Sequence, residues 1–134
     1  MKARSDTVYI IGNGPSLNKI DISMLSGKDT ISFNRAYIAY NDWGFYPKYY
    51  MAVDRIVLDN IKEKVRNLIE TSPIERYFLP LWSREYFGLN EKITYLNLRG
   101  AWLTGRRIWG KSYNRLSLIA NVGATSVPVL KIMG

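Results

Sequence analysis

The 134-residue sequence contains neither cysteine nor histidine. Without cysteine the chain forms no disulfides and no thiolate metal sites, and without histidine it lacks the usual general base and the commonest metal ligand. No apolar run approaches the ~20 residues that a membrane span needs, and the polar residues 1–6 are unlike a signal peptide. We therefore expect a cytoplasmic protein with no membrane span. Its acid–base chemistry would depend on Asp, Glu, Tyr or Lys, or on residues beyond Gly134.

Acidic residues are missing after Glu91. The first 60 residues contain seven Lys and Arg and six Asp and Glu, whereas the remainder contains twelve and five. Basic residues continue after Glu91 as Arg99, Arg106, Arg107, Lys111, Arg115 and Lys131. Such a field attracts nucleotides, phosphorylated acceptors, nucleic acid or an acidic membrane face. A solvated basic surface, balanced by acids in a missing C-terminal part, explains the charge equally well.

Short apolar segments alternate with helical segments along the chain. We predict strands at 7–11, 30–33, 49–53, 76–79 and 93–98, and helical segments at 21–25, 36–42, 56–70 and 82–87. A last helix is expected to start at a Thr125 or Ser126 cap, with Pro128 in its first turn. The alternation predicts one α/β domain over residues 1–134, a Rossmann-like three-layer sandwich whose mostly parallel sheet has helices on both faces. Because the last helix should still lead into a strand, we expect the domain to be truncated at its C-terminus.

Polar residues or glycines follow three of the predicted strands. The first strand is followed by Gly12, Asn13, Gly14, Pro15 and Ser16, the second by Asn34 and Arg35, and the third by Asp54 and Arg55. Ligands of open α/β sheets bind at the carboxyl ends of the strands. If the three strands are neighbours, these residues converge on one crevice. The convergence, rather than any single motif, predicts a binding site.

The glycine loop suits a phosphate group. Gly12 and Gly14 permit positive φ and a close approach of the backbone to a ligand. Exposed N–H groups can hold phosphate oxygens, and Ser16 can cap the next helix or donate to a phosphate. Leu17 stands where the dinucleotide fingerprint needs Gly or Ala, which argues against NAD and FAD. A plain strand-to-helix turn remains the alternative interpretation of the loop.

Asn34 and Asp54 are the other candidates for ligand contacts. Asn34 has both a donor and an acceptor, which suits a base, a ribose or a sugar, although it could simply be a turn residue. Asp54 could hold Mg²⁺ on a phosphate, accept from a hydroxyl or act as a base. Its position also predicts an N-cap for the 56–70 helix, and the two roles can coexist.

Residues 105–112, Gly-Arg-Arg-Ile-Trp-Gly-Lys-Ser, match the letters of a P-loop. No strand directly precedes them, their interior is bulky, and little chain follows for a metal-binding strand. We interpret the segment as a basic loop. Trp102 and Trp109 in this region could stack on a base or sugar, or could pin the loop to the core.

Three segments carry a resemblance to known families. Tyr9-Ile-Ile-Gly-Asn-Gly-Pro-Ser-Leu17, Ile31-Ser-Phe-Asn-Arg-Ala-Tyr37 and Pro47-Lys-Tyr-Tyr-Met-Ala-Val-Asp54 resemble the MptE-like domain family, named for an archaeal 6-hydroxymethylpterin diphosphokinase. The opening Gly-Asn-Gly-Pro-Ser-Leu also resembles that of bacterial sialyltransferases that use CMP-sialic acid. Residues 123–134 are similar to the helix after the second glycine motif in both groups.

The resemblance implies a Rossmann-like fold that binds a nucleotide or nucleotide-sugar, such as a CMP-sugar or ATP. It implies phosphate contacts from Gly12, Asn13, Gly14 and Ser16, contact with the nucleotide or its sugar from Asn34, a donor- or metal-facing place for Asp54, and a closing loop and helix at Gly123, Thr125 and Ser126. Both groups continue with a strand ending in a Gly-x-Asp-like motif, and the sialyltransferases place a catalytic histidine later still. This chain has neither, so we assign no catalytic residue, and binding without turnover is compatible with the sequence.

Three functions are therefore considered. The first is a glycosyltransferase-like, sialyltransferase-like transferase that uses a nucleotide-sugar and a glycan or small-molecule acceptor in surface glycan assembly. The second is ATP-dependent pyrophosphoryl transfer to a pterin, with Mg²⁺ as the expected cofactor. The third is a non-catalytic module that binds polyanions through the basic loop, although no nucleic-acid motif is present and we do not expect that partner. The sequence leaves the donor, the acceptor and the oligomeric state open, a homo-oligomer included.

Overall fold

Five strands form one all-parallel sheet in the order β1-β2-β3-β4-β5 in the computed structural model, which describes residues 6–100, 116–118 and 122–133. The strands are β1 (Tyr9–Ile10), β2 (Thr30–Phe33), β3 (Tyr49–Met51), β4 (Arg76–Pro80) and β5 (Ile93–Leu96). The predicted α/β fold with a parallel sheet is thereby confirmed. A separate parallel pair, β6 (Leu98–Gly100) and β7 (Leu116–Leu118), takes the end of the predicted 93–98 strand away from the main sheet.

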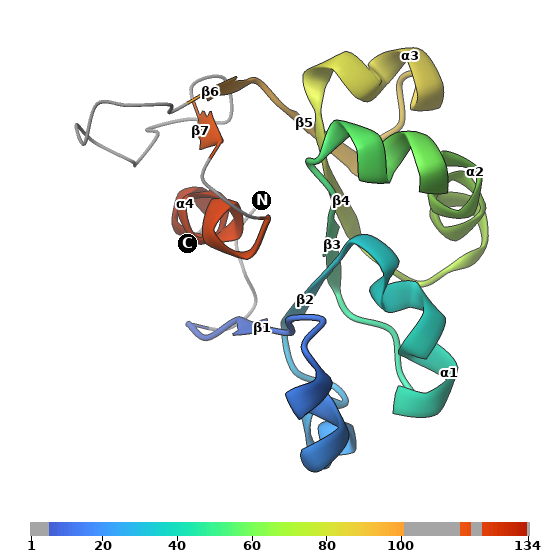
Figure 1. The fold of residues 1–134 in the computed structure, drawn as a ribbon, viewed down its shortest axis with the longest axis vertical. Helices are drawn as coiled ribbons and strands as arrows, with labels where there is room; N and C mark the ends of the chain where they lie inside the picture. Colours follow the sequence, from blue (N-terminus) through green and yellow to red (C-terminus); the bar gives the residue numbers. More distant parts are fainter. Residues whose placement is uncertain (1–5, 101–115, 119–121, 134) are drawn as a thin grey trace.

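Each connection between neighbouring strands contains short helices or one long helix. They are η1 (Pro15–Lys19) and η2 (Ile22–Leu25), then η3 (Asn34–Ala39) and α1 (Tyr40–Trp43), then α2 (Arg55–Thr71), then η4 (Leu81–Ser83) and α3 (Arg84–Phe87). Figure 1 shows α1, α2 and α3 on one face of the sheet and α4 (Val122–Met133) on the other. Right-handed crossovers that always step in the same direction place all their helices on one face, which explains the first layer.

Two buried layers form the core, one on each face of the sheet. Along β3, Tyr50 faces the layer that contains Leu58, Ile61 and Val65 of α2. Its neighbours Tyr49 and Met51 face the layer that contains Val129 and Met133 of α4. This period of two is that of a strand, and burial on both faces explains why β3 has no polar residue facing solvent.

The helix α2 matches the predicted 56–70 helix closely. Asp54 is its N-cap and accepts a hydrogen bond from the Val57 amide at 2.9 Å. Its buried residues, Leu58, Ile61, Val65 and Ile69, recur every three or four positions and so form one stripe. The helix ends before Pro73, whose ring disfavours a helical conformation in the residue that precedes it.

The predicted start of the last helix is wrong. α4 begins at Val122, so Thr125 and Ser126 lie inside the helix and Pro128 is its seventh residue. The physical reason is packing: Ser126, Val129 and Met133 are almost completely buried and share one helical stripe, which favours helix through the predicted cap. The P-loop-like segment and both Trp102 and Trp109 lie outside the described residues. Within the described ranges, no helix is long and apolar enough to cross a membrane.

Candidate functional site

The carboxyl ends of β1, β2 and β3 lie side by side at one edge of the sheet. In the parallel register, Ile31 of β2 pairs with Ile10 of β1 and with Tyr49 of β3. The polar segments that follow these three strands therefore leave the sheet from adjacent positions. This neighbourhood is the condition on which the predicted site depended, and the structure meets it.

A cavity of about 270 Å³ opens beside this edge, between the glycine loop with η1 and the segment formed by η3 and α1. Four of the predicted site residues line it: Asn13, Gly14, Pro15 and Arg35. Apolar walls are supplied by Trp43, Ala36 and Ile38. We call this space the glycine-loop cavity.

The glycine loop is fixed to the end of β2. The Asn13 Nδ2 atom donates to the carbonyl oxygen of Phe33 at 3.0 Å. Among the described glycines, positive φ occurs at Gly27, Gly44 and Gly88, so the positive φ that glycine permits is not used at Gly12 or Gly14. A Cβ atom on Gly12 would meet nothing within 4 Å. The fold itself therefore makes no demand for glycine at this position.

Ser16 does not cap a helix, contrary to one of its two predicted roles. It lies within η1, and the N-cap is Gly14, with φ −76° and no side-chain cap bond. Pro15 occupies the first helical position, where its fixed φ suits the helix and its missing N–H is not needed, so Gly14 is the N-cap. The Ser16 side chain is exposed, so its predicted role as a phosphate donor stays a prediction.

Asn34 has an unusual conformation. Its φ is 49°, the only positive value among the described non-glycine residues. Its carbonyl oxygen accepts from the Tyr50 hydroxyl at 2.6 Å, while its side-chain Oδ1 is buried with no hydrogen-bond partner among the described residues. An unpaired buried acceptor costs about 1–3 kcal/mol. Left-handed backbone and unsatisfied buried atoms of this kind concentrate at functional sites.

Arg35 supplies an available positive charge. Its side chain is exposed, and within the described ranges it forms no ion pair or hydrogen bond. A guanidinium group presents five donors in a planar fork that matches phosphate and carboxylate oxygens. In the glycine-loop cavity, Arg35 is thus the group best suited to an anion.

Asp54 and Arg55 have structural roles at the same edge of the sheet. Asp54 caps α2, as predicted, and the Arg55 guanidinium carbon lies 4.9 Å from the centre of the Trp82 ring, beyond β4. Among the described residues, no group of three or more His, Cys, Asp or Glu side chains could hold a metal ion. Neither residue lines the glycine-loop cavity, and the metal role of Asp54 stays a prediction.

Among the α4 candidates, the side chain of Ser126 lies in the core and not in this cavity. Gly123 and Thr125 lie in the first turn of α4, and the Ser126 side chain is completely buried. The buried residues of α4 pack in the core layer on the face opposite α1 (Figure 1). Ser126 therefore does not contribute to the glycine-loop cavity, and the binding roles predicted for Gly123 and Thr125 stay predictions.

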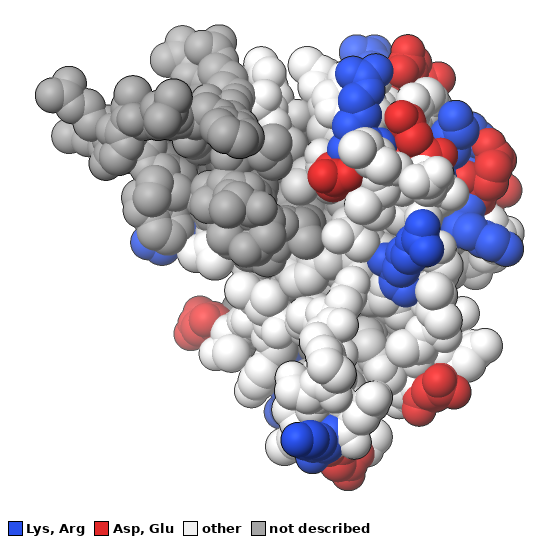
Figure 2. Space-filling view, in the orientation of Figure 1, with Lys and Arg blue, Asp and Glu red and all other residues white. Residues whose placement is uncertain are grey.

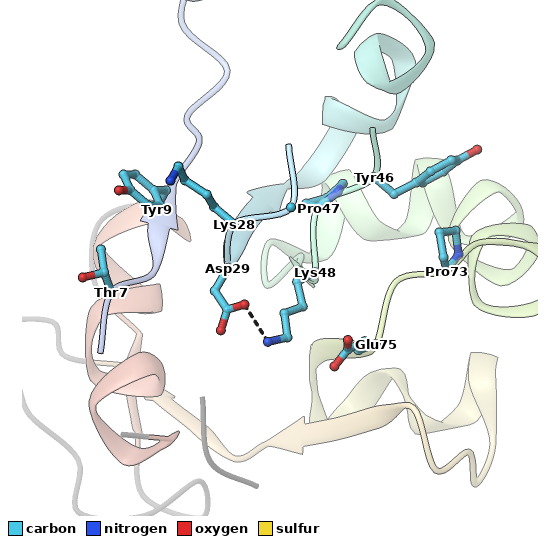
Figure 3. A pocket seen from close by; sticks show the side chains of 10 residues that line it. Thr7, Tyr9, Lys28, Asp29, Tyr46, Pro47, Lys48, Pro73 and Glu75 are labelled. Atoms are coloured by element: carbon cyan, nitrogen blue, oxygen red, sulfur yellow. Dashed lines mark hydrogen bonds and ion pairs between the residues drawn. The ribbon is translucent and has the colours of Figure 1, made fainter. Parts of the chain in front are cut away.

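A larger cavity, of about 640 Å³, lies at the amino ends of the strands (Figure 3). The Lys48 ammonium contacts the Asp29 carboxylate there at 2.6 Å, and each side chain is only 10% exposed. Burial lowers the pKa of Lys48, but hydrogen bonds to Asp29 and Tyr49 raise it by more, so the net shift is upward. This pair is an internal contact between β2 and β3, and parallel sheets bind ligands at the opposite edge. We therefore place the candidate site at the smaller cavity.

The predicted basic field is largely outside the described residues. Four of its six residues lie there: Arg106, Arg107, Lys111 and Arg115. Over α2 and α3, Figure 2 shows basic and acidic side chains interspersed. The face in that view therefore has no continuous basic surface among the described residues.

Residues that the sequence analysis did not single out contribute to the site. Tyr50 lies in the predicted 49–53 strand, and its hydroxyl bonds to the Asn34 carbonyl oxygen. Trp43 and Ile38 line the glycine-loop cavity. No local sequence signal distinguishes Tyr50 from Tyr49, because only the strand register decides which ring lies beneath Asn34.

The comparisons with known proteins found no relative of this chain. No protein-family model matches the chain, and neither a curated protein nor a solved structure matches it. The resemblance to the MptE-like family and to the sialyltransferases therefore stays a prediction.

Proposed function

We propose that the chain is the nucleotide-binding part of a glycosyltransferase-like enzyme, which uses a nucleotide-sugar in surface glycan assembly. One observation carries the proposal: the glycine loop and Arg35 line one cavity at the carboxyl edge of a parallel sheet, and Asn34, which does not line it, directly precedes Arg35. In this class of fold, that edge is where ligands bind.

The chemistry of the cavity suits a phosphorylated ligand. Arg35 offers a forked donor for phosphate oxygens. The exposed glycine at position 12, with open space where a Cβ would lie, leaves room for the backbone to approach the same group. At about 270 Å³ the cavity is just below the roughly 300 Å³ at which sites for drug-sized ligands begin. It therefore fits part of a nucleotide-sugar, with the remainder outside.

Asn34 supports a second polar contact. The buried, unpaired Oδ1 atom would gain a partner if a ribose hydroxyl or a base amino group approached it. Binding would then remove the penalty that the free protein carries. In this arrangement Asn34 would contact the sugar or base of the ligand, next to Arg35 at its phosphate group.

The test is calorimetric titration of the chain with CMP, CDP, UDP and ATP. We expect binding of at least one nucleotide, and a Kd about tenfold to a hundredfold higher in Arg35→Gln, since a charged hydrogen bond contributes about 1.5–3 kcal/mol. Lys64→Gln is the matched control, because Lys64 is an exposed cation on α2. No binding by any of the four, or equal weakening in both variants, would overturn the proposal.

The same titration separates the other two functions. Binding of ATP that requires Mg²⁺ and is weakened by Asp54→Ala would favour pyrophosphoryl transfer to a pterin. Metal-independent CMP binding would decide against it. Affinity for a polyanion that falls steeply with salt would favour the non-catalytic module.

A further inference from the structure

We infer that Tyr50 is a positioning residue for the candidate site, acting on the ligand through Asn34 and Arg35 without touching it. This inference rests on the proposed function, because it assigns a role within the same site. Tyr50 is completely buried in β3, and its ring does not line the glycine-loop cavity.

A hydrogen bond joins the buried Tyr50 side chain to the backbone of Asn34 in the candidate site. The Tyr50 hydroxyl donates to the carbonyl oxygen of Asn34 at 2.6 Å. That carbonyl belongs to the peptide bond between Asn34 and Arg35. Since a peptide unit is planar, one hydrogen bond to its oxygen fixes the direction in which the chain leaves Asn34 and enters Arg35. A single hydroxyl thus orients both candidate ligand-binding residues.

Asn34 needs such a restraint. A left-handed backbone is disfavoured for residues other than glycine, although asparagine tolerates it better than most. The buried Oδ1 without a partner adds a second unfavourable feature in the same residue. Neither feature persists unless the surroundings hold it. The hydrogen bond from Tyr50 of β3 restrains the Asn34 carbonyl at the start of η3, and it makes rotation of that peptide unfavourable.

Two neighbouring buried tyrosines, Tyr40 and Tyr77, use their hydroxyls differently. Tyr40 bonds to the Ser32 hydroxyl at 2.6 Å, and Tyr77 bonds to the Ser72 hydroxyl at 2.8 Å. Both of those contacts join two side chains inside the protein. Tyr77 is also directly opposite Tyr50 in the sheet, with ring centres 5.6 Å apart and equal burial. It is therefore the matched control for Tyr50.

The experiment compares Tyr50→Phe with Tyr77→Phe, using the nucleotide that the unsubstituted chain binds best. Each variant loses one buried hydroxyl contact, so we expect both to lower the Tm, by about 4 °C. Only Tyr50→Phe should raise the Kd, by about fivefold, which is the loss of one ordinary hydrogen bond. Equal effects of the two variants on the Kd would overturn the inference.

Two further readouts separate positioning from general destabilisation. An Asn34→Gly background keeps the carbonyl that Tyr50 contacts but relieves the left-handed strain that the contact holds, so the additional change Tyr50→Phe should raise the Kd by clearly less than fivefold; an undiminished effect contradicts the inference. The ¹H–¹⁵N signal of the Arg35 amide should shift in Tyr50→Phe and not in Tyr77→Phe. If the unsubstituted chain binds no nucleotide, the proposed function fails, whereas an unchanged Arg35 signal overturns the positioning role itself.

Discussion

The Asn13 side chain is tied to Phe33 by a hydrogen bond of 3.0 Å between the amide Nδ2 and the carbonyl oxygen. The bond joins residues 20 positions apart and connects the loop after β1 with the end of β2. Asn13→Ala should therefore lower the free energy of unfolding by about 1 kcal/mol and weaken nucleotide binding. Urea denaturation and calorimetry measure the two effects. Asn60→Ala, at an exposed position of α2, is the control, and equal effects of both variants would contradict the role of Asn13.

Gly12 is predicted to serve the ligand rather than the fold. Gly12→Ala should leave the free energy of unfolding unchanged or raise it by up to about 1 kcal/mol, because alanine fits the space and restricts the unfolded chain. It should still weaken nucleotide binding. Gly44→Ala is the contrast, since its φ of 73° makes a Cβ unfavourable and should lower stability by about 1 kcal/mol or more. If both variants destabilise alike, the fold requires glycine at position 12.

The two predicted roles of Asp54 can be separated by substitution. Asp54→Ala should lower the free energy of unfolding by about 1 kcal/mol through loss of the α2 cap, whereas Asp54→Ser should retain most of it, because serine is also a good N-cap. If Asp54 holds Mg²⁺, both variants lose metal-dependent ATP binding. If Asp54 is only a cap, Asp54→Ser binds nucleotides like the unsubstituted chain. Denaturation and calorimetry with and without Mg²⁺ give the answer.

The Asp29–Lys48 pair should be important for stability. Both side chains are only 10% exposed, so Lys48→Met leaves a largely buried carboxylate without its ammonium partner. We expect a loss of about 3 kcal/mol in the free energy of unfolding. Lys28→Met, an exposed lysine on the same cavity, should change it by less than about 0.5 kcal/mol. Similar losses in both variants would show that the pair contributes little.

Stability should fall at alkaline pH because of buried tyrosines. Burial raises the pKa of Tyr77 to about 12, although its hydrogen bond to Ser72 lowers it in part. The unfolded chain loses this proton near pH 10, so the folded state holds more protons between pH 10 and 12 and the free energy of unfolding falls as pH rises there. Burial also raises the pKa of Tyr40 and Tyr50. Urea denaturation from pH 8 to 12 should show a smaller slope in Tyr77→Phe, and an unchanged slope would contradict this account.

Local sequence patterns were sufficient to predict much of the fold. The strand 30–33 and the helix 56–70 were predicted nearly as they occur, because β-branched apolar residues, an N-cap and a terminating proline act within a few residues. The failures came where packing overrides such signals. The cap at Thr125 or Ser126 is helix interior because a buried stripe continues through it, and the end of the 93–98 segment belongs to a different sheet.

The amino-acid sequence by itself determined the five strands of the main sheet, the helix α2 and the polar residues that follow the first three strands. Only the tertiary structure decided that β1, β2 and β3 are neighbours in that order, and that Arg35 lines a cavity while Ser126 is buried in the other layer. It alone decided that Tyr50 lies beneath the left-handed Asn34, 16 residues away. Strand order and register arise from packing between distant segments, and a period of two tells which residues share a face but not which partner each one meets.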